Sequence, residues 1–169
     1  GLIAGQQWSN PMARHRSPHI FGIWSAMLGL MAPHDKPWPG RLAVMTRLHL
    51  ELDEIRTAPQ PSHECWRNLA DAMNYLQSCA ELNLIQDPDG AIDAAKAALL
   101  DGHGNVERHH KLRMSGRSLE SLAGLIDNLG EILDQISERQ HWSIVRRTEK
   151  RIGEIWSGKV KKGDVVIHL

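Results

Sequence analysis

The chain has 169 residues, of which 41% are apolar and 24% charged, so its composition excludes a fibrous repeat and a largely disordered protein. Twenty basic residues balance twenty acidic ones, which excludes nucleic-acid binding through net charge alone. Apolar residues recur by three and four in almost every segment, which predicts an all-α bundle of five or six helices with coiled-coil-like packing. We expect one domain over 19–158, an N-terminal extension over 1–18, and a basic linker with a β-prone tail over 159–169.

The apolar run from Ile20 to Ala32 has two interpretations. It follows Arg14 and Arg16 and ends in a small residue before Pro33, as a targeting segment would. At thirteen residues it is too short to span a bilayer. We favour a buried helix. The origin of residues 1–11, native or from an expression vector, is left open.

The next two helices are separated by a proline-rich stop. The first follows Gly40, and its predicted buried face comprises Leu42, Met45, His49, Leu52 and Ile55. Two prolines within Thr57–Pro61 end it, because each removes a backbone donor. Ser62 is expected to cap the second helix. Its predicted buried face comprises Trp66, Leu69, Met73, Leu76 and Ala80.

Both cysteines, Cys65 and Cys79, fall on that second helix. They are fourteen residues apart, which is about 21 Å along a helix axis. A disulfide needs Cα atoms within about 7 Å, so we expect two unpaired thiols. Unpaired thiols favour a reducing cytosol, and we predict a cytoplasmic protein.

A third helix follows the turn at 86–90, where Asp and Pro favour a helix start. Ile92, Ala95 and Leu99 are expected to face inward. The glycines of Gly102–Gly104 weaken the helix by about 1 kcal/mol each, so that segment is either a kink or a break.

The most regular stretch begins after Ser115–Ser118. It has heptad spacing over almost three heptads and forms the predicted interaction seam: Leu119, Leu122, Ile126, Leu129, Leu133 and Ile136. A second register, Val145, Thr148, Ile152 and Ile155, follows. Either one long helix changes its buried face, or a turn at 141–143 folds the chain back. Residues 164–169 are β-prone.

Charge is unevenly distributed along the chain. Residues 49–101 hold three basic and ten acidic residues, whereas residues 138–169 hold eight basic and four acidic ones. We favour internal complementarity between packed helices as the explanation. The alternative is an intermolecular or nucleic-acid role for the basic ends.

Metal and nucleophile chemistry find little support in the sequence. Glu107 and His110 form one E-x-x-H spacing, but a di-iron bundle needs two and further inward Glu residues. His49 with Asp53, and His103 with His109, could contribute ligands, yet we expect exposed or capping histidines and no metal or cofactor.

Ser62, or Cys65 beside His63, would be the nominal nucleophile, since Cys65 lies near a helix N-terminus that can favour a thiolate. No oxyanion hole, orienting acid, P-loop or G-x-S-x-G accompanies them. We therefore predict no enzyme and no catalytic residue.

A basic cluster near the C-terminus suggests a second function. Arg146, Arg147, Lys150 and Arg151 lie within two helical turns. Trp142 and Trp156 flank them and could stack on bases if exposed. The alternative is a solvated helix face, which we favour.

The stretch Arg113–Gly116, the leucine and isoleucine run after it, and Lys150–Ile152 with Trp156–Val160 resemble the C-terminal half of small helical proteins encoded on proteobacterial prophages and plasmids. The resemblance covers about a third of the chain. It implies a bacterial cytosolic accessory or regulatory factor and supplies no activity or site residues.

These observations lead to two hypotheses. The first is a non-enzymatic module that self-associates as a dimer or binds a protein partner through the 119–136 seam. The alternative is a DNA- or RNA-binding regulator that uses the basic C-terminal helix. No membrane and no small-molecule substrate is inferred.

Overall fold

The structure is a computed structural model that describes residues 20–87 and 90–159. It confirms the all-α fold, with six helices and no strand in those ranges. The predicted N-terminal extension and the β-prone tail lie outside the described residues. The helices are α1 (Ala26–Met31), α2 (Arg41–Thr57), α3 (His63–Glu81), α4 (Ala91–His109), α5 (Gly116–Gln135) and α6 (Glu138–Trp156).

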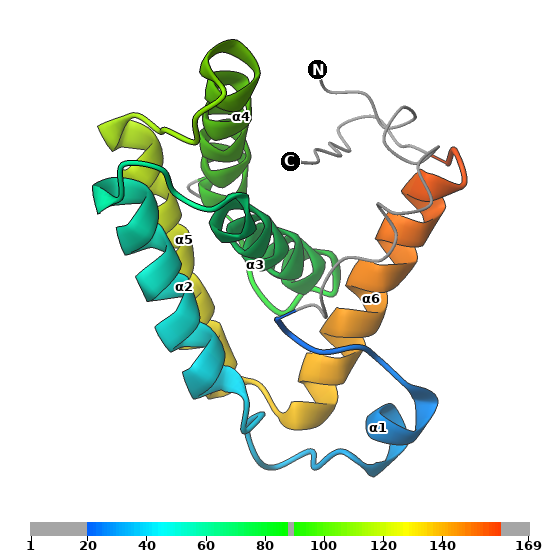
Figure 1. The fold of residues 1–169 in the computed structure, drawn as a ribbon. Coiled ribbons are helices and arrows are strands. Elements are labelled where there is room, and N and C mark those ends of the chain that lie inside the picture. The colour runs from blue at the N-terminus through cyan, green and yellow to red at the C-terminus, as the bar shows by residue number, and fades with distance from the viewer. Residues whose placement is uncertain (1–19, 88–89, 160–169) are drawn as a thin grey trace.

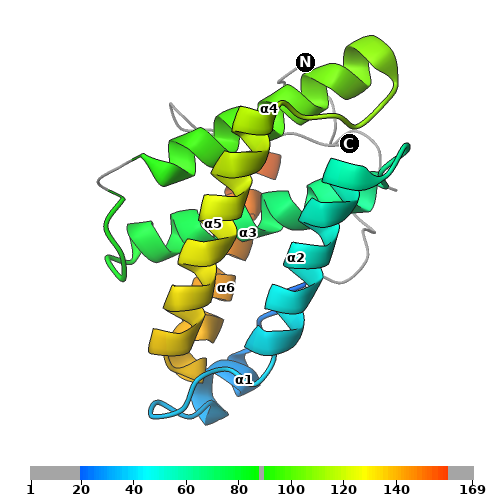
Figure 2. The same cartoon turned by 90° about the vertical axis from the view of Figure 1, so that its left-hand side faces the viewer.

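Helix α3 is the central element, because it packs against α2, α4, α5 and α6 (Figure 1). Helices α2 and α5 lie side by side and run in opposite directions (Figure 2). Helix α6 turns away from the lower end of α5, and α1 packs on α6 at that end (Figure 1). One hydrophobic core runs through the five long helices and includes Phe21 from the segment before α1.

Side chains cap the starts of several helices, and Ser62 does so as predicted. The Ser62 side chain accepts a hydrogen bond from the backbone N–H of Glu64, and the Ser115 side chain accepts one from Ser118. Asp87 accepts bonds from the first two backbone N–H groups of α4. Each cap satisfies backbone donors that the first turn of a helix leaves unpaired.

The prediction of a buried helix over 20–32 is wrong. Only Ala26–Met31 is helical, and no residue of α1 is buried. Gly22 has a φ of 85°, and Ser25 is extended and caps the helix, so the chain cannot be helical before residue 26. Pro33 follows the C-cap residue Ala32. The segment instead buries Phe21, which lies five residues before α1, and Ala32, which directly follows it.

The predicted buried face of α2 is partly wrong. Leu42 and His49 are exposed, and Met45 is half-buried. The face toward the core consists of Val44, Leu48, Glu51, Leu52 and Ile55. Apolar residues lie all round this helix, so spacing alone could not select the side that faces α3 and α5.

Helix α4 is continuous through Gly102 and Gly104, so the helix does not break there. A Cβ at Gly102 would lie 2.6 Å from the Cε atom of Met114. The missing side chain therefore provides room for the connection that leads into α5.

The junction of α5 and α6 differs from both alternatives. The chain leaves the helix at Ile136, five residues before the expected turn, and α6 begins with a capping box between Ser137 and Gln140. The backbone N–H groups of Glu138 and Arg139 donate to the carbonyls of Lys36 and Pro33, at 2.7 and 3.0 Å. Those bonds join the start of α6 to the segment between α1 and α2.

Candidate functional site

The predicted interaction seam lies inside the molecule. Helix α5 packs against α2, α3 and α4, which cover the seam side chains. Leu122, Ile126 and Leu129 have no exposed surface. Leu133 and Ile136 are buried too, and Leu119 is half-buried. The facing helices that the heptads require therefore come from the same chain, and the seam supplies no contact surface for a second copy.

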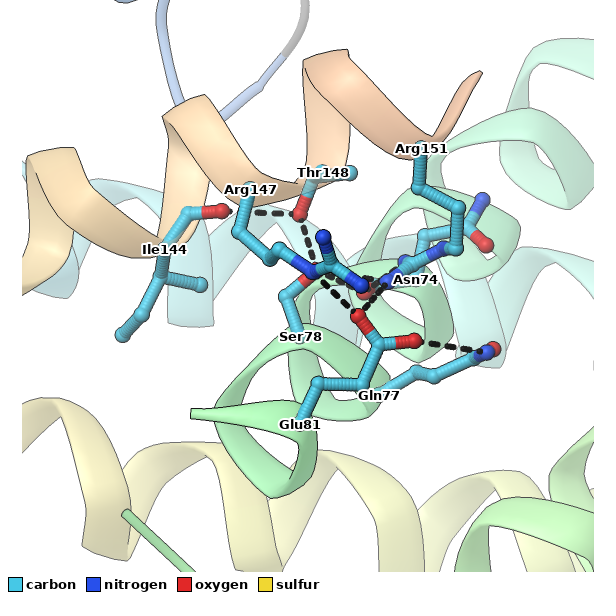
Figure 3. Close-up of polar contacts among 8 residues, drawn as sticks. All are labelled: Asn74, Gln77, Ser78, Glu81, Ile144, Arg147, Thr148 and Arg151. Atoms are coloured by element: carbon cyan, nitrogen blue, oxygen red, sulfur yellow. Dashed lines mark hydrogen bonds and ion pairs between the residues drawn. The ribbon is translucent and has the colours of Figure 1, made fainter. Parts of the chain in front are cut away.

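The predicted basic cluster is divided between buried and exposed positions. The Arg151 guanidinium is buried between α6 and α3, where it lies 2.9 Å from the Glu81 carboxylate (Figure 3). It also donates to the Ser78 hydroxyl at 3.0 Å and to the Asn74 carbonyl at 2.8 Å. Arg147 donates to the same Glu81 oxygen at 2.6 Å. Two of the four basic residues therefore pair with one acidic residue of α3.

These pairs explain part of the uneven charge distribution. Burial by itself raises the pKa of Glu81, but hydrogen bonds and positive charge from Arg147 and Arg151 outweigh it and hold that pKa below its usual value. Next to this pair, the hydroxyls of Ser78 and Thr148 lie 2.6 Å apart (Figure 3). Here the basic C-terminal helix complements the acidic middle of the chain.

The other two basic residues lie on a different side of α6. The Arg146 guanidinium lies 4.8 Å from the Trp24 ring, a cation–π contact with the segment before α1. Lys150 is exposed. Of the two flanking tryptophans, Trp142 is buried and Trp156 is 38% exposed. The four basic side chains therefore do not form one joint surface with two stacking platforms.

A buried aromatic cluster fixes the segment that carries α1, and the sequence patterns did not indicate it. The His141 ring, fully buried, stacks on Trp38 with ring centres 3.8 Å apart. Its Nδ1 atom lies 2.8 Å from the Tyr75 hydroxyl, and its Nε2 atom lies 3.1 Å from the Phe21 carbonyl oxygen. Phe21 in turn stacks on Tyr75. Four aromatic side chains from three parts of the chain thus anchor residues 20–38 on α3 and α6.

The α1 segment presents the largest group of exposed apolar side chains in the described part of the chain. We call this group the α1 face. It consists of Ile23, Met27, Leu28, Leu30 and Met31, which are 63%, 70%, 40%, 81% and 78% exposed. Grouped exposed apolar side chains on a folded protein are typical of contact surfaces, whereas single ones are common everywhere. Leu42 and Leu50 on α2 are also exposed.

The structure is unfavourable for a Cys65 nucleophile. Both Cys65 and Cys79 are buried and unpaired, which confirms the absence of a disulfide. Burial, together with the Glu54 carboxylate 3.0 Å from the sulfur, raises the pKa of Cys65 to about 12. The helix N-terminus therefore does not yield a thiolate, contrary to that part of the sequence argument.

The residues considered as metal ligands do not converge. Glu107, His109, His110, His49 and Asp53 are exposed, whereas His103 is buried near Trp66. Within residues 20–87 and 90–159, no group of three His, Cys, Asp or Glu side chains could hold a metal ion.

Comparison with known proteins gives no relative. No family model, curated protein or solved structure matches this chain. The resemblance to prophage and plasmid proteins therefore stays a prediction. Among the described helices, none combines the length and apolar character needed to cross a membrane.

Proposed function

We propose that this chain is a non-enzymatic helical interaction module that forms a homodimer through the α1 face. The observation that carries the proposal is the exposure of five large apolar side chains on one short segment. Burying such side chains against another protein surface is favourable by about 25 cal/mol per Å². The contact surface thus differs from the 119–136 seam, whose side chains are used in the core.

Attachment of the segment to the rest of the molecule supports this function. The Trp24 backbone N–H donates to Glu149 at 3.0 Å, and the Arg139 guanidinium donates to the Ala32 carbonyl at 3.1 Å. With the Phe21–His141 bond, these contacts fix the segment at both ends of α1. A surface that is ordered before binding loses less conformational entropy when it binds.

Charge does not oppose a second copy as the partner. The α1 face has no charged member, and the chain has equal numbers of basic and acidic residues. Two copies therefore do not repel each other through net charge, and an apolar patch can be its own complement across a two-fold axis. Because α1 spans only about 9 Å, the contact is small and we expect micromolar affinity.

The cellular setting is part of the same proposal. Two unpaired cysteines fit a reducing cytosol, so we place the module in the cytoplasm. A bacterial accessory role rests on the resemblance of the C-terminal third. The nucleic-acid alternative has less support, because Arg147 and Arg151 pair with Glu81.

Oxidative trapping tests the proposed dimer. Leu30→Cys adds an exposed thiol at the α1 face to a chain whose described cysteines are both buried. The matched control is Leu50→Cys, on the outer side of α2 with a 66% exposed side chain. We expect mild oxidation to give a covalent dimer of Leu30→Cys far faster than of Leu50→Cys. Equal rates for the two variants would contradict the proposal.

A further inference from the structure

The connection between α4 and α5 concentrates positive charge. All four Lys and Arg residues of the segment 102–137 fall between positions 108 and 117, and no acidic residue lies between those positions. They are Arg108, Lys111, Arg113 and Arg117, accompanied by His109 and His110. This basic stretch is at the opposite end of the molecule from α1 (Figures 1 and 2).

The backbone of this connection is held in place. His110 ends α4 in the left-handed conformation, with a φ of 56°, and the Leu112 side chain is buried in the core. The Asn105 amide donates to the carbonyls of Arg113 and Asp101, at 2.9 and 3.1 Å. These contacts join the connection to α4 and support a pocket of about 360 Å³, which Asn105, His109, Lys111 and Arg113 line.

The basic groups of the pocket lack acidic partners in the described part of the chain. No ion pair there involves Lys111, Arg113 or His109, whereas Arg41, Arg47, Arg67, Arg147 and Arg151 each pair with a carboxylate. The Asp101 carboxylate is engaged elsewhere. It accepts bonds from the Ser115 backbone N–H and the Ser118 hydroxyl, both at 2.9 Å. Within residues 20–87 and 90–159, no carboxylate pairs with the cations of this pocket as Glu81 does with those of α6.

From these observations we propose that the pocket at the α4–α5 connection binds the phosphate group of a small ligand. Its volume lies in the range of small-molecule sites, and Lys with Arg is the usual pair for holding phosphate. The C-terminal end of the α4 dipole carries about half a negative charge, which disfavours an anion. Lys111 and Arg113 contribute two full positive charges, which outweigh it.

Calorimetric titration tests this site. The probes are inorganic phosphate, pyrophosphate and ATP, each at constant ionic strength, which removes general screening. We expect saturable binding of one molecule per chain by at least one probe. If phosphate binds as tightly as ATP, the ligand is the free ion; if ATP binds more tightly, it is a nucleotide or similar ester. Both results support the site. If none of the three probes binds saturably, the proposal is overturned.

Two variants with equal loss of charge separate the pocket from general electrostatics. Lys111→Gln with Arg113→Gln should weaken binding by at least about tenfold, because both phosphate-holding groups are removed. Lys150→Gln with Arg56→Gln removes the same charge from exposed positions on α6 and α2 and should leave affinity within about twofold. Equal weakening by both pairs would overturn the proposal. Circular dichroism and the unliganded Tm check that each variant is folded.

Discussion

Arg151 shows how one side chain can be misjudged from sequence. Its neighbours in the chain are basic, so the pattern groups it with exposed cations. In the fold, α6 directs it into a polar site on α3 where Glu81, Ser78 and the Asn74 carbonyl all accept from it. Whether a basic residue on an amphipathic helix is buried depends on an acceptor far away in sequence, which no local pattern contains.

Replacing Arg151 therefore has a structural cost that its neighbour does not share. Arg151→Met should reduce the free energy of unfolding by about 2–4 kcal/mol, because it removes three hydrogen bonds from a buried site, one of them to the Glu81 carboxylate. Lys150→Met, at an exposed position, should change it by less than about 0.5 kcal/mol. Urea unfolding of the two variants measures the difference. Similar small effects would contradict the assigned role of Arg151.

The depressed pKa of Glu81 predicts a pH dependence of known sign. The unfolded chain binds the Glu81 proton near the ordinary value of 4.5, and the folded chain binds it only at lower pH. Its contribution is therefore complete above pH 4.5 and is lost as the pH falls through the folded pKa. Glu81→Gln should be less stable than wild type at about pH 7, and the difference in stability should narrow as the pH falls below 4.5. A gap that is constant with pH would contradict this account.

At the scale of the helix, two glycines provide a matched comparison. A Cβ at Gly124, within α5, or at Gly90, before α4, would meet nothing within 4 Å. Gly90 has a φ of 67°, which a side chain disfavours, whereas Gly124 is helical. Gly124→Ala should stabilise by about 0.5–1 kcal/mol, and Gly90→Ala should destabilise by about 1 kcal/mol. Urea midpoints of the two variants check these opposite signs.

Helix positions and caps were largely predictable from the sequence, and helix surroundings were not. Ser62, Ser115 and the proline-rich stop carry local information, because capping and proline chemistry act within one turn. The heptads of 119–136 correctly indicated buried side chains. They could not tell whether the facing helix was internal, since a seam has the same spacing in both cases.

The α1 segment was misjudged for the opposite reason. Its apolar run has the composition of a buried helix, but Gly22, Ser25 and Pro33 limit the helix to six residues. No side chain of this short helix is buried in the core. The segment is anchored instead by Phe21, which packs in the aromatic cluster around His141. The exposure of the candidate contact surface is therefore explained by the short length of α1 and by its capping more than by hydrophobicity.

At the scale of the whole molecule, the core and the α1 face should respond differently to truncation. Leu129 has no exposed surface, so Leu129→Ala should reduce the free energy of unfolding by about 3–5 kcal/mol. Leu30 is 81% exposed, and Leu30→Ala should leave monomer stability within about 0.5 kcal/mol. Thermal and urea unfolding of both variants at low concentration would measure this. A well-folded, fully stable Leu129→Ala chain would contradict an internal seam.

The most direct test of the central claim is sedimentation equilibrium of the wild-type chain and of the Leu30→Ser, Met31→Ser double variant over a range of concentrations. The wild type should rise from the monomer mass toward twice that mass with a micromolar dissociation constant. The double variant should stay monomeric with unchanged helicity, because both side chains lie on the α1 face and outside the core. A wild-type chain that stays monomeric throughout, or a double variant that dimerises equally well, would contradict the account.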